Sequence, residues 1–200
     1  MIAVLDYGIG NLRSAEKALQ KAGGDARLVT TAAEADGASA VVLPGVGAFG
    51  RCMEALRASG LDCVALDAVA AGTPFLGICV GMQMLYEASE ENPEVRGLAV
   101  IPAMVRRLPD GVKRPQMQWN VLQPVGGGSK LIDGLGAEPW AYFVHSYAAD
   151  ATDDVVATCD YGGSVVAAVE RGNVMATQFH PEKSGDTGLA ILQNFVKLAA

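Results

Sequence analysis

The chain has 200 residues, of which 50% are hydrophobic and 18% are charged, and its formal net charge is -7. This composition supplies a core for one ordinary globular domain and excludes intrinsic disorder, which requires low hydrophobicity and high charge. The acidic balance also disfavours a dedicated nucleic-acid binder or a polybasic membrane-surface protein, because both carry an excess of Lys and Arg. We therefore expect a single domain over residues 1–200.

The cysteine and histidine content favours a protein without a metal centre. The four cysteines, Cys52, Cys63, Cys79 and Cys159, form no C-x-x-C pair, and two histidines cannot complete a typical zinc site with them. We see neither the basic and apolar segments of a secretory signal nor an apolar run of the ~18 residues that a membrane span needs. We expect reduced thiols in a cytoplasmic protein.

The first half of the chain alternates short apolar runs with segments of helical periodicity. The apolar runs predict buried strands over residues 1–5, 26–30, 40–43 and 74–78. The periodic segments predict helices over 11–22, 51–58, 61–71 and about 80–87, the first of them capped by Asn11. Strands that alternate with helices in this way indicate parallel βαβ units.

The second half is rich in strand-like segments separated by glycine-containing turns. These segments predict strands over residues 100–108, 120–124, 140–144, 154–159, 165–170 and 174–178. A last helix is predicted over 187–198, where apolar residues recur at helical spacing. Together the two halves predict an α/β fold: a three-layer α/β/α sandwich whose mostly parallel sheet is extended by antiparallel strands.

The strongest local signal is the sequence G-I-C-V-G over residues 77–81, which follows a predicted strand and opens a predicted helix. This is the strand-turn-helix context of a nucleophile elbow, with Cys79 in the place of serine. Such a turn strains the backbone of the nucleophile and leaves no room for side chains beside it. A helix N-terminus would also stabilise a thiolate. The alternative is a buried structural cysteine at a tight turn, because free cysteines are often buried.

His180 and Glu182 form a second candidate cluster just beyond the predicted strand over 174–178. The carboxyl ends of parallel strands share one edge of a sheet, so His180 and Cys79 can meet there. In an extended segment residues 180 and 182 point to the same side, and Glu182 could then orient the imidazole of His180. That is the nucleophile, base and orienter arrangement of a catalytic triad. The alternative is a surface loop with an incidental histidine and glutamate.

Residues 45–50 match G-x-G-x-x-G and follow another predicted strand. A dinucleotide site is one interpretation, but an acidic residue about 20 positions later is not well placed at a strand end. Glycines also let backbone N–H groups turn towards a developing negative charge, as in an oxyanion loop. A plain turn between strand and helix is the third interpretation.

These segments together resemble the signatures of class-I glutamine amidotransferases: P-G-V-G over 44–47, G-I-C-V-G-M-Q over 77–83 and H-P-E over 180–182. The resemblance narrows to the glutaminase subunits of imidazole glycerol phosphate synthase through three longer segments and spans nearly the whole chain. These are D-Y-G-I-G-N-L over 6–12, Y-F-V-H-S-Y over 142–147 and H-P-E-K-S-G over 180–185.

The resemblance implies hydrolysis of glutamine to glutamate and ammonia without a metal or organic cofactor. Cys79 would attack the side-chain amide, His180 would move the proton, and Glu182 would orient His180. The implied oxyanion donors are the backbone N–H groups of Val46, Gly47 and Val80. The implied substrate contacts are Gln83, Ser146 and Tyr147; Gln83 lies one helical turn after Cys79.

The resemblance also implies a partner, a (β/α)8-barrel cyclase that receives the ammonia and makes imidazole glycerol phosphate and an aminoimidazole carboxamide ribotide. The residues implied at or near this interface are Asn11, Trp119, Asn120, Tyr142 and Lys183. One departure is Gln118, which stands where the family usually has glycine. If that position has a positive φ, glutamine there would strain the backbone by about 1 kcal/mol.

Three other functions stay open at this point. An amidotransferase subunit of another pathway would keep the triad and change the partner. A stand-alone cysteine hydrolase would need no partner at all. A non-enzymatic dinucleotide-binding module would use the loop over 45–50 and leave Cys79 inert.

Overall fold

The structure, a computed structural model, describes residues 1–199 and is built on an eight-stranded mixed sheet. The spatial order of its strands is β2-β1-β3-β4-β13-β12-β11-β8, and the pairs from β2 to β13 are parallel. The parallel strands are β1 (Ile2–Leu5), β2 (Ala26–Val29), β3 (Ala40–Gly45), β4 (Phe75–Cys79) and β13 (Val174–Thr177). Four of the five are buried along their whole length, as expected for apolar runs covered by helices on both faces.

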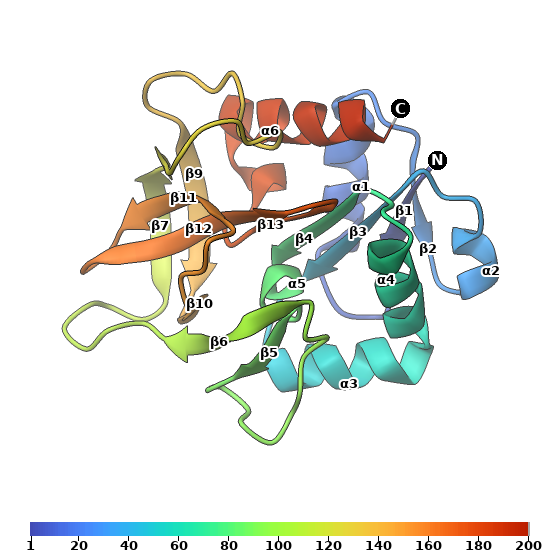
Figure 1. The fold of residues 1–200 in the computed structure, drawn as a ribbon, viewed down its shortest axis with the longest axis horizontal. Coiled ribbons are helices and arrows are strands. Elements are labelled where there is room, and N and C mark those ends of the chain that lie inside the picture. The colour runs from blue at the N-terminus through green and yellow to red at the C-terminus, as the bar shows by residue number, and fades with distance from the viewer. Residues whose placement is uncertain (200) are drawn as a thin grey trace.

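Antiparallel strands continue the sheet beyond β13. They are β12 (Ser164–Arg171), β11 (Val155–Asp160) and β8 (Gln123–Pro124). The predicted three-layer fold with an antiparallel extension is therefore confirmed. In Figure 1 the parallel strands lie in the middle and right of the view, between two layers of helices, and β12 and β11 continue the sheet to the left.

Helices cover both faces of the parallel strands (Figure 1). On one side α1 and α6 pack against each other, and on the other side α3 packs against α4. The helices are α1 (Leu12–Lys21), α2 (Ala32–Ala35), α3 (Phe49–Ser59), α4 (Leu61–Ala70), α5 (Val80–Gln83) and α6 (Gly185–Leu198), with a 3-10 turn, η1 (Pro181–Lys183), before α6. No helix within residues 1–199 combines the length and apolarity needed to cross a bilayer.

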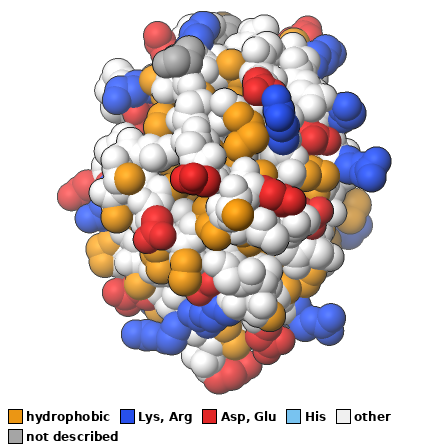
Figure 2. Space-filling model, turned by 90° about the vertical axis from the view of Figure 1, so that its right-hand side faces the viewer, with side chains coloured by type: hydrophobic (Ala, Val, Ile, Leu, Met, Phe, Trp, Pro, Cys, Tyr) orange, Lys and Arg blue, Asp and Glu red, His pale blue; other side chains and the backbone are white. Residues whose placement is uncertain are grey.

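Two smaller sheets stand beside the main one. The first contains β10 (Tyr147–Ala149), β6 (Ile101–Arg107) and β5 (Tyr86–Ser89); the second pairs β7 (Gln116–Val121) with β9 (Trp140–His145). Figure 1 places β7 and β9 at the end of the molecule opposite the two chain termini. Figure 2 shows the face at the terminal end, where charged side chains of both signs are scattered among small apolar groups.

Three expectations about local structure were wrong. The helix predicted to reach residue 87 ends at Gln83, and β5 follows, because a short run that is buried on all sides gives no reliable period. The strand predicted over 120–124 is two strands, β7 and β8, which belong to different sheets. The side-chain cap expected from Asn11 is absent: Asn11 occupies the N-cap position of α1, but its side chain accepts from the hydroxyl of Ser14 at 2.7 Å and from no backbone N–H of the helix. Helix α2 and strand β10 were not anticipated.

Candidate active site

Cys79 is the last residue of β4, and its backbone is strained. It adopts φ 55° and ψ -111°, a positive-φ conformation that costs a non-glycine residue about 1–3 kcal/mol. The flanking glycines are sterically required: a Cβ on Gly77 would lie 2.9 Å from the carbonyl oxygen of Gly81. A Cβ on Gly81 would collide with the carbonyl oxygen of Leu43 in the neighbouring strand. The predicted strained turn with no room for side chains is confirmed.

His180 lies just beyond β13, and its ring meets a buried carboxylate. His180 Nδ1 is 2.7 Å from Oε1 of Glu182, whose side chain is 3% exposed. The predicted extended conformation is confirmed for His180, which has φ -97° and ψ 97°. It is wrong for the residues that follow, which form the turn η1. Pro181 starts the turn η1, where its fixed φ is well accommodated. This turn, rather than an extended strand, brings Glu182 to the imidazole.

The electrostatic surroundings of His180 favour a protonated ring. Burial would lower the pKa of His180, but its contacts with Cys79 and Glu182 outweigh burial and raise that pKa to about 9. Because Nδ1 faces Glu182, Nε2 is the nitrogen left for the thiol of Cys79. The imidazole is therefore placed to hold a proton taken from the cysteine.

A cavity of about 500 Å³ lies over Cys79 and His180. It brings together most residues that the sequence singled out and contains all the predicted oxyanion and substrate residues. Those lining it are Asn11, Val46, Gly47, Cys79, Val80, Gln83, Ser146, Tyr147, His180 and Lys183. Glu182 lies behind His180, and Trp119, Asn120 and Tyr142 lie outside the cavity.

The loop between β3 and α3 carries backbone donors beside the cavity. Among the hydrogen bonds that residues 1–199 make outside helices and strands, none uses the N–H of Val46 or Gly47. The N–H of Val80 is at the first position of α5, where helices leave their donors unpaired. Gly47 has φ +95°, a conformation that an L side chain rarely adopts.

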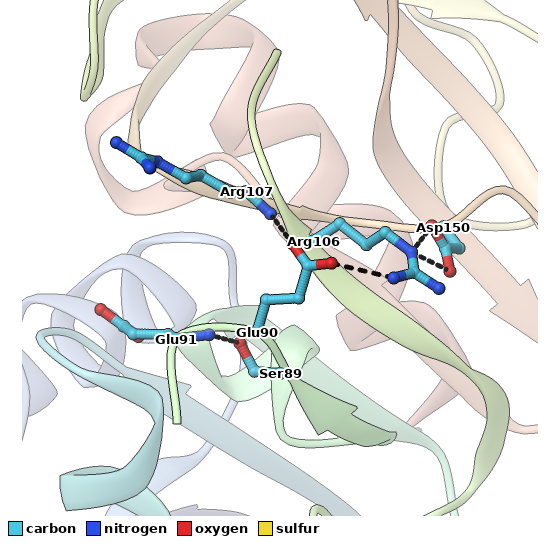
Figure 3. A network of polar contacts seen from close by, with 6 residues as sticks. All are labelled: Ser89, Glu90, Glu91, Arg106, Arg107 and Asp150. Carbon is cyan, nitrogen blue, oxygen red and sulfur yellow. Dashed lines mark hydrogen bonds and ion pairs between the residues drawn. The ribbon is translucent and has the colours of Figure 1, made fainter. Parts of the chain in front are cut away.

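Glu91 is a cavity residue that the sequence reasoning missed. Its Oε2 accepts the N–H of Phe49 at 2.8 Å, at the start of α3 directly after the glycine loop. Figure 3 shows that the hydroxyl of Ser89 accepts the N–H of Glu91, at 3.2 Å. The sequence reasoning missed Glu91 because a helix was expected to run to about residue 87, whereas residues 86–89 form a strand that leads to Glu91.

An ion-pair network fixes the segment that carries Glu91 (Figure 3). Glu90 accepts from Arg106 Nη1 at 2.9 Å and from the N–H of Arg107 at 3.0 Å. Arg106 also contacts Asp150, with Nε and the carboxylate 3.0 Å apart. Exposed ion pairs contribute little stability individually, but this one joins β5, β6 and the end of β10 beside the cavity.

The amide of Gln83 is already occupied by protein acceptors. Its Nε2 donates to the carbonyl oxygen of Tyr147 and to Oε1 of Gln178, both at 3.0 Å. Gln178 is a second residue that sequence reasoning missed, and its Nε2 lies 3.8 Å from the sulfur of Cys79. Gln83 therefore joins the strand ends around the cavity, and its remaining oxygen is the group available to a ligand.

His145 also lines the cavity but has no carboxylate beside it. Its Nδ1 lies 2.9 Å from the carbonyl oxygen of Tyr147. Burial lowers the pKa of His145 to about 4, so the ring is neutral near pH 7. The surroundings of His145 therefore lower its pKa, whereas those of His180 raise its pKa.

An exposed apolar surface covers one side of the β7–β9 pair. Trp119 and Tyr142 face each other across the strands, with ring centroids 6.0 Å apart, and Trp119 is 48% exposed. Met117 and Trp140 are similarly exposed. We call this surface the ribbon face; it comprises Met117, Trp119, Val121, Trp140, Tyr142 and Val144.

Asn120 does not belong to the ribbon face, because side chains alternate along a strand. Its Nδ2 donates to the carbonyl oxygen of Asp160 at 2.9 Å, which ties β7 to the end of β11. Gln118 does not meet the condition for backbone strain, because among the described non-glycine residues only Cys79 and Ala99 have positive φ. Gln118 is an ordinary strand residue with an exposed side chain.

Comparison with known proteins identifies the family. The family model for class-I glutamine amidotransferases matches residues 3–199. The chain belongs to the class-I glutamine amidotransferase family. It is 50% identical to imidazole glycerol phosphate synthase subunit HisH of Methanothermobacter thermautotrophicus, over 99% of this chain and 98% of the relative. The protein of the same name from Deinococcus radiodurans is 48% identical over 97% of this chain and 92% of its own.

Solved structures agree with this assignment. A crystal structure of a glutamine amidotransferase superposes with a TM-score of 0.78 at 25% identity, covering 99% of this chain and 98% of that one. The structure of PurLQS from Thermotoga maritima shares the fold, with a TM-score of 0.79 at 20% identity over 98% of this chain and 97% of that one. The amidotransferase fold and the enzyme class are therefore established for this chain.

Proposed function

We propose that this chain is the glutaminase subunit of an imidazole glycerol phosphate synthase and serves histidine biosynthesis. The observation that carries the proposal is the 2.7 Å contact between His180 and Glu182 beside a strained Cys79. Full-length relatives that bear the synthase name support the choice of pathway. Residues 1–200 would form one amidotransferase domain, in the cytoplasm, where its four unpaired cysteines stay reduced.

The reaction starts when the sulfur of Cys79 attacks the side-chain amide carbon of glutamine. His180 Nε2 takes the thiol proton and then gives it to the departing nitrogen, which leaves as ammonia. A γ-glutamyl thioester remains on Cys79 until water, activated by His180, cleaves it to glutamate. Glu182 holds Nδ1–H throughout, which fixes the orientation of the ring and stabilises its positive charge.

The tetrahedral intermediate places a negative charge on the former amide oxygen. Its proposed donors are the N–H groups of Val46, Gly47 and Val80, because all three residues line the cavity beside Cys79. Donors of this kind act through preorganisation, and one of them is worth about 10²–10³-fold in rate. Oxyanion stabilisation also explains the glycine loop without a dinucleotide.

Substrate recognition requires groups for the α-ammonium and α-carboxylate of glutamine. Glu91 is the acidic residue lining the cavity, and its carboxylate suits the ammonium. Ser146 lies between β9 and β10 and Tyr147 starts β10, and both residues border the cavity. Gln83 contributes mainly by holding Tyr147 in place.

Ammonia released into water would be protonated and lost, so the product needs a receiving partner. We propose the (β/α)8-barrel cyclase expected from the sequence, which would form a heterodimer with this chain and take the ammonia directly. The ribbon face suits such a partner, because it gathers exposed aromatic and apolar side chains beside the cavity. Asn11 and Lys183, which border the cavity, would lie near the same interface.

A short hydrogen-bonded path joins the ribbon face to the catalytic histidine. The N–H of Tyr142 donates to the hydroxyl of Ser184 at 2.9 Å, and that hydroxyl donates to the carbonyl oxygen of His180 at 2.6 Å. The N–H of His180 in turn donates to the carbonyl oxygen of Tyr142 at 3.0 Å. A partner that shifts β9 would therefore move His180, which supports activation of the glutaminase by complex formation.

The test is glutamate release by the isolated chain, by the chain with its cyclase, and by the complex with a ribonucleotide ligand. We expect low turnover alone and a rise of orders of magnitude in the liganded complex. Trp119→Ala should weaken complex formation, whereas Leu66→Ala, at a similarly exposed apolar residue on α4, should not. Equal turnover in all three conditions would instead identify a stand-alone hydrolase.

A further inference from the structure

Two buried side chains hold the glycine loop from the side away from the cavity. The hydroxyl of Tyr7 donates to the carbonyl oxygen of Pro44 at 2.7 Å. The thiol of Cys52, on α3, donates to the carbonyl oxygen of Val46 at 3.3 Å. Tyr7 is 6% exposed and Cys52 is 0% exposed, and neither lines the cavity.

Both groups keep their protons at neutral pH and so act as donors. Burial is the main reason that the pKa of Tyr7 and the pKa of Cys52 are raised above their ordinary values. Each therefore donates to one carbonyl oxygen of the loop, Tyr7 to that of Pro44 and Cys52 to that of Val46.

Because the peptide between Val46 and Gly47 is trans, the hydrogen bond to the carbonyl of Val46 also sets the direction of the N–H of Gly47. The C=O and N–H of one peptide point in opposite directions. Because the carbonyl of Val46 is directed to Cys52, the N–H of Gly47 is directed away from Cys52. Gly47 has φ +95° and no side chain to fix it, so this peptide would otherwise turn at little cost.

We propose that Tyr7 and Cys52 are positioning residues for glutamine hydrolysis, holding the peptides on either side of the Gly45–Val46 peptide. With the carbonyl of Val46 held by Cys52 and that of Pro44 held by Tyr7, the N–H of Gly47 stays directed to the substrate side.

The proposal rests on the proposed glutaminase function and is tested on the complex with its cyclase. Cys52→Ala and Tyr7→Phe each remove one donor and keep most of the packing. Each should lower kcat by about threefold to tenfold, the rate equivalent of one ordinary hydrogen bond, and leave KM for glutamine unchanged. Cys52→Ser restores a donor and should recover most of the lost kcat.

Cys159→Ala is the matched control, because Cys159 is also buried at 0% exposure but lies on β11 away from the loop. It should lower the unfolding temperature as Cys52→Ala does, without changing kcat. Equal kcat for these two alanine variants, or failure of Cys52→Ser to recover the rate, would overturn the positioning role. A native complex that releases no glutamate would reject the proposed function and this role with it.

Discussion

The most informative single substitution is Glu182→Gln, which removes a charge while keeping the shape of the side chain. In the native protein Oε1 of Glu182 lies 2.7 Å from Nδ1 of His180, in a site that solvent does not reach. A glutamine there can still accept a hydrogen bond through its oxygen. It can also present its amide hydrogens to Nδ1, which would favour the wrong tautomer of the ring.

The size of the effect follows from this contact. A buried hydrogen bond to a charged group contributes about 1.5–3 kcal/mol. If this energy stabilises the imidazolium in the transition state, its loss lowers kcat about 10- to 150-fold. The pKa of His180, about 9 in the native site, should also fall, since burial then acts with less opposition.

The assay is kcat/KM for glutamate release by the complex between about pH 6 and pH 10. The protonated ring is lost above the pKa of His180, so the alkaline decline should move to lower pH in Glu182→Gln. Glu54→Gln is the control, because Glu54 is an exposed carboxylate on α3 outside the cavity and its loss should leave the profile unchanged. A native rate and an unmoved alkaline decline in Glu182→Gln would refute the assignment of Glu182 as the residue that orients His180.

Three further outcomes are expected. Cys79→Ala should abolish glutamate release, and Cys63→Ala, at an exposed thiol, should retain it. Burial lowers the pKa of His145 to about 4 from about 6.5 in the unfolded chain. The contribution of neutral His145 to the free energy of unfolding is therefore full above pH 6.5 and falls by about 3 kcal/mol towards pH 4. Urea unfolding at pH 6.5 and at pH 4 should show a smaller fall in His145→Gln than in the native protein. Gly81→Ala should cost about 1–3 kcal/mol or more in thermal unfolding, because its Cβ meets the carbonyl of Leu43, whereas Gly127→Ala has open space and should be neutral.

Much of the fold could be predicted from the sequence because its signals are local. The parallel strands are continuous apolar runs buried on both faces, and a run of that kind leaves few alternatives. The elbow at Cys79 was predictable for the same reason, since glycines at 77 and 81 are needed by sterics within a few residues. The prediction of a helix from residue 80 to about residue 87 failed after Gln83, because burial on all sides removes the periodicity that separates helix from strand.

The residues that can do chemistry stand out in the chain, whereas the groups that surround them depend on how the chain folds. Cys79, His180 and Glu182 were identifiable from local context. The pKa of His180 is raised because its contacts with Cys79 and Glu182 outweigh burial, whereas burial lowers the pKa of His145, which has no carboxylate beside it. Glu91 reaches the cavity, and Tyr7 reaches the loop, only because separate strands and helices converge there. Such contacts join residues by packing, and no pattern within a single segment of the chain encodes them.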